Sequence, residues 1–239
     1  SIEEALALVV EVTLAASELE TVQEIAQTAL SRICEILGLG FGQVWFPDVS
    51  NENLVCSPLA GFSLLEQEQL RQESLDRTLN IGRSEGLPGM AAASRTAVFL
   101  SDLKSESRPS LHHSDSLRHG FALPVFNGDN ILCVFEFFGP HKLVTDKYFL
   151  NALDEIAAHL SVVFERRRAQ ELLVIQRAHE EIILDSMPVM VWFKDTQGRI
   201  LRVNRSGAAK RGMEPWQMVG KSDWELYPDE ADLYYADDL

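Results

Sequence analysis

Residues 145–187 contain neither glycine nor proline, and their pattern indicates one long helix. Apolar side chains recur at intervals of three and four on both sides of a charged run at 165–168, namely Phe149, Leu153, Ile156, Leu160 and Val163 before it and Leu172, Ile175, Ile182 and Ile183 after it. This spacing is typical of a helix with one buried stripe. At 1.5 Å per residue the helix would extend about 60 Å, which is too long for a domain of this size to cover.

The second half of that stripe can be buried against another copy of the same helix. We therefore predict that residues 145–187 end one domain, begin the next and form the axis of a parallel homodimer. The alternative is two shorter helices that break near residues 166–170, each packed on its own domain. The lack of a helix breaker favours the continuous helix.

Composition limits the classes of partner and compartment. The chain has 239 residues, enough for one large or two smaller domains, and its net charge of −15 argues against nucleic acid or an anionic membrane surface as a partner. No apolar run reaches the length of a membrane span, and no signal peptide is visible. Cys34, Cys56 and Cys133 are widely spaced and form no CxxC motif. We expect neither disulfides nor a zinc site, and a cytoplasmic location.

The remaining pattern predicts an α+β fold. Before the long helix we expect helices at 2–19 and 21–37, a surface helix at 64–78, a short helix at 88–94, and strands at 41–46, 54–59, 97–100, 121–126 and 131–138. The first helix should bury Leu6, Val9, Val10 and Thr13. Residues 101–119 form a long polar loop. After Pro188 we expect strands at 189–194 and 200–203 and short helices, and because two strands make no stable sheet alone, this second domain is cut short.

An ordered set of short motifs resembles a GAF domain. The motifs are Gly86-Leu87-Pro88-Gly89, Arg95-Thr96-Ala97-Val98-Phe99 with Asp102, Leu117-Arg118-His119-Gly120-Phe121-Ala122-Leu123-Pro124-Val125, Asn127-Gly128 and Val134-Phe135-Glu136-Phe137-Phe138. The resemblance covers residues 2–168, including the flanking helices. It implies an antiparallel sheet flanked by helices, with a small molecule held between one sheet face and the short helix and loops above it.

Residues 176–239 resemble the first half of a PAS domain. The carriers are Ile183-Leu184-Asp185-Ser186-Met187-Pro188, Trp192-Phe193-Lys194-Asp195, Gly198-Arg199-Ile200, Val203-Asn204-Arg205 and Val219-Gly220-Lys221-Ser222-Asp223, with Tyr227-Pro228 and Asp237-Asp238. We place a partial PAS domain at 188–239. A GAF–helix–PAS string is typical of cytoplasmic sensor regions in microbial histidine kinases and diguanylate cyclases. The resemblance implies a regulatory fragment that is not itself an enzyme, with its output domain elsewhere in the parent protein.

Several activities of these families leave residue signatures that can be checked. Covalent bilin attachment needs a Cys beside a His, but the loop holds His112-His113 and no Cys. GAF domains that bind cyclic nucleotides carry an Asn-Lys…Phe…Asp-Glu pattern. This chain has Asp146-Lys147, Phe149 and Asp154-Glu155, which differ from it in the first residue and in spacing, so a cyclic nucleotide is not expected. A methionine sulfoxide reductase of the GAF type is the enzyme alternative, yet the three cysteines fall on an apolar helix face or within strands. The cofactor is unknown, and a ligand-free dimerisation spacer remains the third alternative.

Strand alternation and the resemblance together suggest a ligand site. In the fifth strand Ile131, Cys133, Phe135 and Phe137 point one way, and Leu132, Val134, Glu136 and Phe138 point the other. By resemblance the second set faces the pocket. A lone carboxylate on an apolar face needs a partner, which Arg118 or His119 could supply. Glu136 is then either an anchor for a ligand amine, a pH-sensitive latch or half of a structural pair. Trp45, Leu87, Met90 and Phe99 could line the same cavity.

Overall fold

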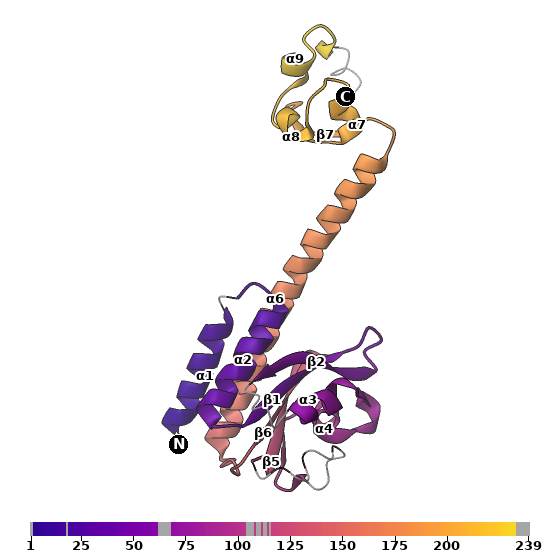
Figure 1. Ribbon diagram of the computed structural model, residues 1–239. Helices are drawn as coiled ribbons and strands as arrows, with labels where there is room; N and C mark the ends of the chain where they lie inside the picture. The colour runs from indigo at the N-terminus through magenta and orange to yellow at the C-terminus, as the bar shows by residue number, and fades with distance from the viewer. Residues whose placement is uncertain are drawn as a thin grey trace. The chain divides into compact units, whose positions relative to one another are not determined.

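The computed structural model describes residues 2–17, 19–61, 68–103, 108, 111, 114 and 116–232 (Figure 1). It divides into two compact units, residues 1–169 and residues 170–239, which we treat separately. The first unit has helices on both sides of one antiparallel sheet, and the second is a small α+β segment. The predicted fold class is therefore confirmed. No helix among the described residues is both long enough and apolar enough to cross a membrane.

Two helices open the first unit: α1 spans Ile2–Ser17 and α2 spans Val22–Leu37. The Thr21 hydroxyl accepts a hydrogen bond from the Glu24 amide, and the Glu24 carboxylate accepts one from the Thr21 amide, so α2 begins with a capping box. The stripe predicted for α1 is wrong, since Leu6 and Val10 are exposed. The buried stripe is Ala5, Leu8, Val12 and Ala16. This helix carries two apolar stripes, and the one with two alanines permits the closer helix packing.

The sheet has the order β3-β2-β1-β6-β5-β4, and every neighbouring pair is antiparallel. The strands are β1 (Phe41–Pro47), β2 (Asn53–Gly61), β3 (Thr78–Asn80), β4 (Val98–Leu100), β5 (His119–Asn127) and β6 (Asn130–Gly139). Five follow the sequence prediction; β3 begins at the last residue of the predicted surface helix and was not expected. A two-residue turn at Gly128 and Asp129 joins β5 to β6, and Gly128 has a φ of +56°.

Helices cover both faces of this sheet (Figure 1). On one face α1, α2 and the first part of the long helix pack over a core that includes Ile33, Phe137 and Leu160. A side chain at Gly42 would lie 2.7 Å from the Cys34 sulfur, so α2 approaches the sheet closely. On the other face α3 (Glu68–Leu75), the 3-10 helix η2 (Ile81–Arg83) and α4 (Gly86–Ser94) cover a second core. The short helix expected at 88–94 thus begins two residues earlier, at Gly86.

The long helix α6 spans Lys147–Ser186 without interruption, as the lack of a helix breaker predicts. Its first part contributes Leu153, Ile156, Leu160 and Phe164 to the core of the first unit. Beyond residue 170 its apolar stripe is exposed: Leu172 and Ile182 each keep 66% of their surface, and Ile175 keeps 50%.

The second unit pairs β7 (Trp192–Lys194) with β8 (Ile200–Val203) and adds the short helices α7 (Arg205–Ala209), α8 (Pro215–Met218) and α9 (Asp223–Leu226). Its core is small and includes Ile200, Met218 and Leu226. The buried Asn204 side chain donates to the carbonyl oxygens of Leu184 and Val189 at 2.9 and 2.8 Å, which ties the hairpin to the last turn of α6. The predicted residues beyond 232 lie outside the described part of the chain.

Candidate functional site

A bulge in the β5–β6 pairing sorts the side chains of β6. Val125 pairs with Cys133 and Phe126 pairs with Ile131, so Leu132 is an extra residue in the ladder. Beyond the bulge Glu136 and Phe138 share the face covered by α3 and α4, as alternation predicts. Before the bulge the prediction is wrong. Ile131 lies on the face covered by α3 and α4, and Leu132 lies in the core under α1, α2 and α6. One inserted residue in a strand exchanges the sheet faces to which all the side chains beyond it point.

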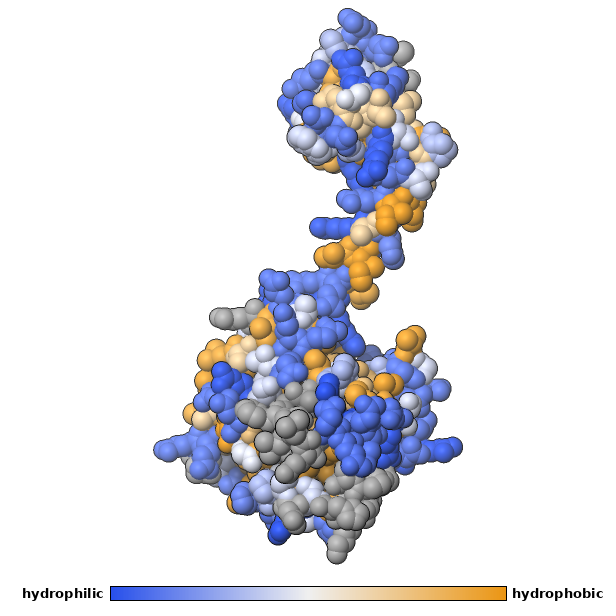
Figure 2. Space-filling view, viewed as in Figure 1, coloured by the Kyte–Doolittle hydropathy of each residue, from blue (hydrophilic) through white to orange (hydrophobic). Residues whose placement is uncertain are grey.

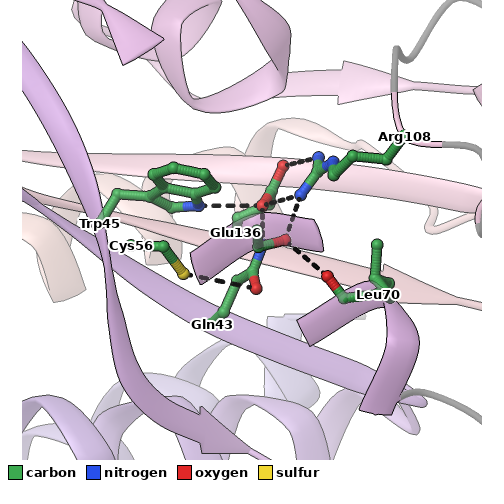
Figure 3. Close-up of polar contacts among 7 residues, drawn as sticks. Gln43, Trp45, Cys56, Leu70, Arg108 and Glu136 are labelled. Atoms are coloured by element: carbon green, nitrogen blue, oxygen red, sulfur yellow. Dashed lines mark hydrogen bonds and ion pairs between the residues drawn. The ribbon is translucent and has the colours of Figure 1, made fainter. Parts of the chain in front are cut away.

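Glu136 is fully buried and holds the centre of a polar cluster (Figure 3). Arg108 donates through Nη2 to Oε1 at 2.5 Å and through Nη1 to Oε2 at 2.9 Å, a bidentate pair. Oε2 also accepts from the Gln43 amide at 2.5 Å and from the Trp45 indole at 3.0 Å. Both carboxylate oxygens are therefore occupied by donors from the chain itself.

The partner of Glu136 is thus Arg108 rather than Arg118 or His119. Arg118 is exposed and joins the sheet through its backbone amide, which donates to the Gly139 carbonyl oxygen at 2.9 Å. Gly120 faces the Glu136 side, where a side chain would collide with the Phe138 ring at 2.7 Å. His119, one residue earlier, consequently points to the opposite side of the sheet. The polar loop reaches Glu136 through a residue ten positions earlier than expected.

Further buried polar groups hold the Arg108–Glu136 ion pair in place. The Ser74 hydroxyl accepts from the Gln43 amide at 2.9 Å and from Arg108 Nη1 at 3.2 Å, and it donates to the Leu70 carbonyl oxygen at 2.9 Å. The Cys56 thiol donates to Gln43 Oε1 at 3.6 Å. The sequence predicted that the helix now seen as α3 has little to bury, but it supplies both Ser74 and Leu70 to this cluster.

Aromatic side chains surround the guanidinium. The Arg108 carbon Cζ lies 5.1 Å from the Phe138 ring centroid, and the Phe138 ring stacks on Phe41 at 6.4 Å. Arg108 keeps 2% of its surface and Glu136 none. A buried pair of this kind costs several kcal/mol when one partner is removed, because the other charge is left uncompensated. Chemically the arrangement is a cation site made of a carboxylate and an aromatic face, and Arg108 fills it.

The other predicted pocket residues divide between the two faces. Trp45 and Leu87 are buried on the Glu136 face. Met90 on α4 keeps 38% of its surface and is not part of that core. Phe99 lies on the face covered by α1, α2 and α6, where it stacks on Phe121 with ring centroids 5.5 Å apart. Of the eight predicted site residues, the fold therefore brings four together, Trp45, Leu87, Glu136 and Phe138. The other four, Met90, Phe99, Arg118 and His119, lie elsewhere.

One of the missed residues, Gln43, carried a signal in the sequence. Alternation along β1 places Gln43 on the same face as Phe41 and Trp45, and a polar residue at a core position needs a partner. In the sheet Gln43 stands directly opposite Glu136. Arg108 carried no such signal, because it lies in a long polar stretch with no periodicity.

The thiols are packed rather than poised for chemistry. Cys34, Cys56 and Cys133 are all buried and free. Desolvation raises the pKa of the Cys34 and Cys56 thiols to about 12 and raises the pKa of Cys133 as well. In the described part of the chain no three His, Cys, Asp or Glu side chains are arranged to hold a metal ion. His112 and His113 lie outside the described residues.

Comparisons with known proteins agree with this architecture. A family model described as "GAF domain" matches residues 20–165, and one described as "PAS fold" matches residues 184–238. Comparison with curated protein sequences gave no match.

Three solved structures share the fold at low sequence identity. A GAF domain of a phosphoenolpyruvate-protein phosphotransferase from Coxiella burnetii aligns with a TM-score of 0.58 at 15% identity, over 72% of this chain and 99% of that one. The corresponding Acinetobacter domain gives 0.54 at 12% identity, over 70% and 96%. Free methionine-R-sulfoxide reductase from Neisseria meningitidis, in complex with its substrate, gives 0.55 at 16% identity, over 70% and 91%. At these identities the likeness concerns the fold alone.

Proposed function

This chain belongs to the GAF domain family and also contains a segment with the PAS fold, and from that premise we propose that it is the sensory relay of a signal-transduction protein. In this proposal the GAF domain acts through α6 on the PAS segment and on an output domain outside this chain, such as a histidine kinase or a diguanylate cyclase. The chain itself catalyses no reaction. The free thiols fit a reducing compartment, and we assign the protein to the cytoplasm.

The observation that carries the proposal is the division of α6 into two parts. Its first part is built into the GAF core through Leu153, Ile156 and Leu160. Its second part continues as the same helix but leaves an apolar stripe exposed (Figure 2). A change in the GAF core that shifts the first part must move the second, because the two belong to one hydrogen-bonded helix. A relay of this kind needs two states with different ligand affinity.

We further propose that the exposed stripe pairs with the same stripe of a second copy. Leu172, Ile175 and Ile182 are spaced at three and seven residues, the pattern of a coiled-coil seam. Each keeps at least half of its surface exposed in the single chain. A parallel arrangement would pair each domain with its own copy, so that a change in the GAF pair can act on the PAS pair through the paired helices.

Sedimentation velocity tests this dimer. We expect the wild-type chain to sediment as a dimer and the double variant Leu172→Glu/Ile175→Glu to sediment as a monomer with unchanged helicity. Val174→Glu is the matched control, since Val174 is equally apolar and 68% exposed but lies off the seam. A monomeric wild type would refute the dimer, and loss of the dimer in the control would show that the seam is assigned to the wrong face.

The thiol environment supports a relay over a reductase. Reduction of a sulfoxide by cysteine requires an accessible thiolate. The three cysteines of this chain are buried, and desolvation raises their pKa. Each also has a packing role or a local bond; the Cys56 thiol, for example, donates to Gln43.

The polar cluster limits what the Glu136 face can bind. A ligand that uses Glu136 has to replace Arg108, so its recognised group would be a guanidinium or an ammonium. Native mass spectrometry of the purified chain separates this from the spacer alternative. A bound cationic molecule would support sensing at Glu136, whereas a dimer of unmodified mass at millimolar arginine or alkylamine would limit this face to a structural role.

A further inference from the structure

A hollow of about 180 Å³ lies on the face of the sheet opposite Glu136, the face covered by α1, α2 and α6. It is enclosed by the ends of β4 and β5 and by the connection from β6 to α6. We propose that this hollow binds a small monocarboxylate with a compact apolar body. The proposal goes beyond the relay function, since binding here can be measured whether or not the chain signals.

The floor of the hollow is apolar and rigid. Phe99 and Phe121 stack with ring centroids 5.5 Å apart, and Leu39 is 8% exposed beside them. Leu143 closes the floor from the connection to α6. An apolar cavity of about 150 Å³ is known to hold benzene, so the volume suits a ligand body of one small ring or a branched chain.

A polar atom at this floor has no partner. His119 lines the hollow, and its Nδ1 atom is buried without a hydrogen-bond partner among the described residues. As the ring stands this nitrogen is shielded from the hollow; a turn of the imidazole about its χ2 bond would present it to a ligand oxygen and recover the free energy that the unpaired nitrogen costs. The unpartnered histidine therefore marks where the polar end of a ligand would lie.

The rim of the hollow favours a negative charge. His141 and Lys142 stand at its opening and are exposed, and Ser101 and Thr145 add hydroxyl groups. No Asp or Glu is among the described residues that line it. A carboxylate can accept from the imidazole and pair with the Lys142 ammonium, while its apolar body covers the stacked rings. Inorganic phosphate has the charge but lacks the body, and a neutral amide has the body but lacks the charge.

The place of the hollow gives bound carboxylate a route to the helix. Residues 141–145 of its wall lead directly into α6, which begins at Lys147. Phe99 also contacts Phe149 in the first turn of α6, with ring centroids 6.3 Å apart. A ligand that fills the hollow would thus touch the two groups of residues that fix the start of α6.

Benzoate, benzamide and phosphate are the probes for this site. We would follow the histidine ring signals of the full chain by NMR during titration with each of them. Ligand efficiencies of small molecules put the Kd of benzoate at roughly 0.1–1 mM. We expect benzoate to shift the signals of His119 and His141 and to leave those of His159 and His179 unchanged. Benzamide and phosphate should each bind at least about fivefold more weakly.

Two variants tie binding to the named groups. His119→Phe keeps a ring of similar size but removes both ring nitrogens, so benzoate should bind at least about tenfold more weakly. Lys142→Ala keeps the hollow and should weaken benzoate roughly threefold to fivefold without changing benzamide, as the loss of one exposed charge implies. Lys147→Ala removes a nearby ammonium that does not line the hollow, and it should leave both constants unchanged. Thermal unfolding of each variant checks the fold.

The outcomes are distinct. No shift of His119 at 10 mM benzoate in the wild type would overturn the site. Equal binding by His119→Phe would also overturn it, and so would benzamide binding as tightly as benzoate, since the charge would then play no part. None of these results depends on dimerisation, so failure of the carboxylate site and failure of the relay can be told apart.

Discussion

Removing the Arg108 guanidinium while keeping its stem should destabilise the first unit strongly. In Arg108→Met the Glu136 carboxylate loses two charge-assisted bonds, at 2.5 and 2.9 Å, and stays fully buried. It keeps the Gln43 amide and the Trp45 indole as donors, which carry no charge. Breaking one side of a buried pair typically costs about 3–5 kcal/mol of unfolding free energy, so we expect a loss in that range.

A surface pair of the same residue types is the control. Arg32 and Glu35 are joined at 3.1 Å, but their side chains are 46% and 58% exposed. Arg32→Met should cost less than about 1 kcal/mol, because solvent screens the charges and replaces the lost bond. The contrast between the two variants measures burial, since the residue types and the change are the same.

Trp45 reports on this unit directly. It is the only tryptophan in residues 1–169, and its indole donates to Glu136. We would replace Trp192, Trp216 and Trp224 with Phe and follow urea unfolding by fluorescence, so that the second unit is silent. A cycle with Glu136→Gln completes the test: the double variant should lose at least about 1.5 kcal/mol less than the sum of the single losses.

The opposite result is easy to recognise. If Arg108→Met costs no more than Arg32→Met, or if the two single losses simply add, the Arg108–Glu136 pair does not hold the cluster together. The loop that carries Arg108 would then have to be anchored by other residues.

Three further predictions concern the thiols, the hairpin carboxylate and the sheet. Burial raises the pKa of the Cys56 thiol from 9.0 to about 12, which at pH 8 leaves roughly a thousandfold less thiolate. Iodoacetamide should therefore modify Cys56 about a thousandfold more slowly in the native chain than in urea. Stoichiometric labelling of the native chain would contradict this. Hydrogen bonds from Asn53 and Ser50 lower the pKa of Asp48 from 3.8 to about 2, so its carboxyl carbon should titrate near pH 2 by NMR. The stability that this carboxylate contributes should be present above about pH 4 and lost as the pH falls through about 2. A titration midpoint near pH 4 would refute the hydrogen bonds. Gly120→Ala should lower the Tm by several degrees, because its Cβ would lie 2.7 Å from the Phe138 ring, whereas Gly82→Ala, with no contact closer than 3.4 Å, should leave it nearly unchanged.

Local rules predicted much of the fold from particular residues. The helix expected at 21–37 begins at a Thr21–Glu24 capping box, and the strands expected at 121–126 and 131–138 are joined by a tight turn after Asn127, both of which are local signals. The continuous α6 followed from the lack of glycine and proline over 40 residues. These features depend on neighbours in the sequence, so the sequence alone determines them.

Features that depend on packing escaped prediction. The bulge at Leu132 has no marker in the sequence, and it changed the face of two residues. The partner of Glu136 depended on where a long loop returns, and nothing in the pattern of residues 101–119 distinguishes Arg108 from Arg118. The buried stripe of α1 was decided by the neighbouring α2, because both of its stripes are apolar.

Distances between the α6 helices of two chains test the relay most directly. With the native cysteines buried, a spin label at Gln170→Cys or at Leu184→Cys gives one label per chain. In a parallel dimer each site should give a single short distance of about 15–25 Å, since paired helices lie roughly 10 Å apart. Mixing chains labelled at 170 with chains labelled at 184 adds a cross distance: because the sites are about 21 Å apart along the helix, this distance should be longer than the like-label distances in a parallel pair, whereas it would be the shortest distance in an antiparallel pair centred between the two sites. No dipolar signal at either site would contradict the account.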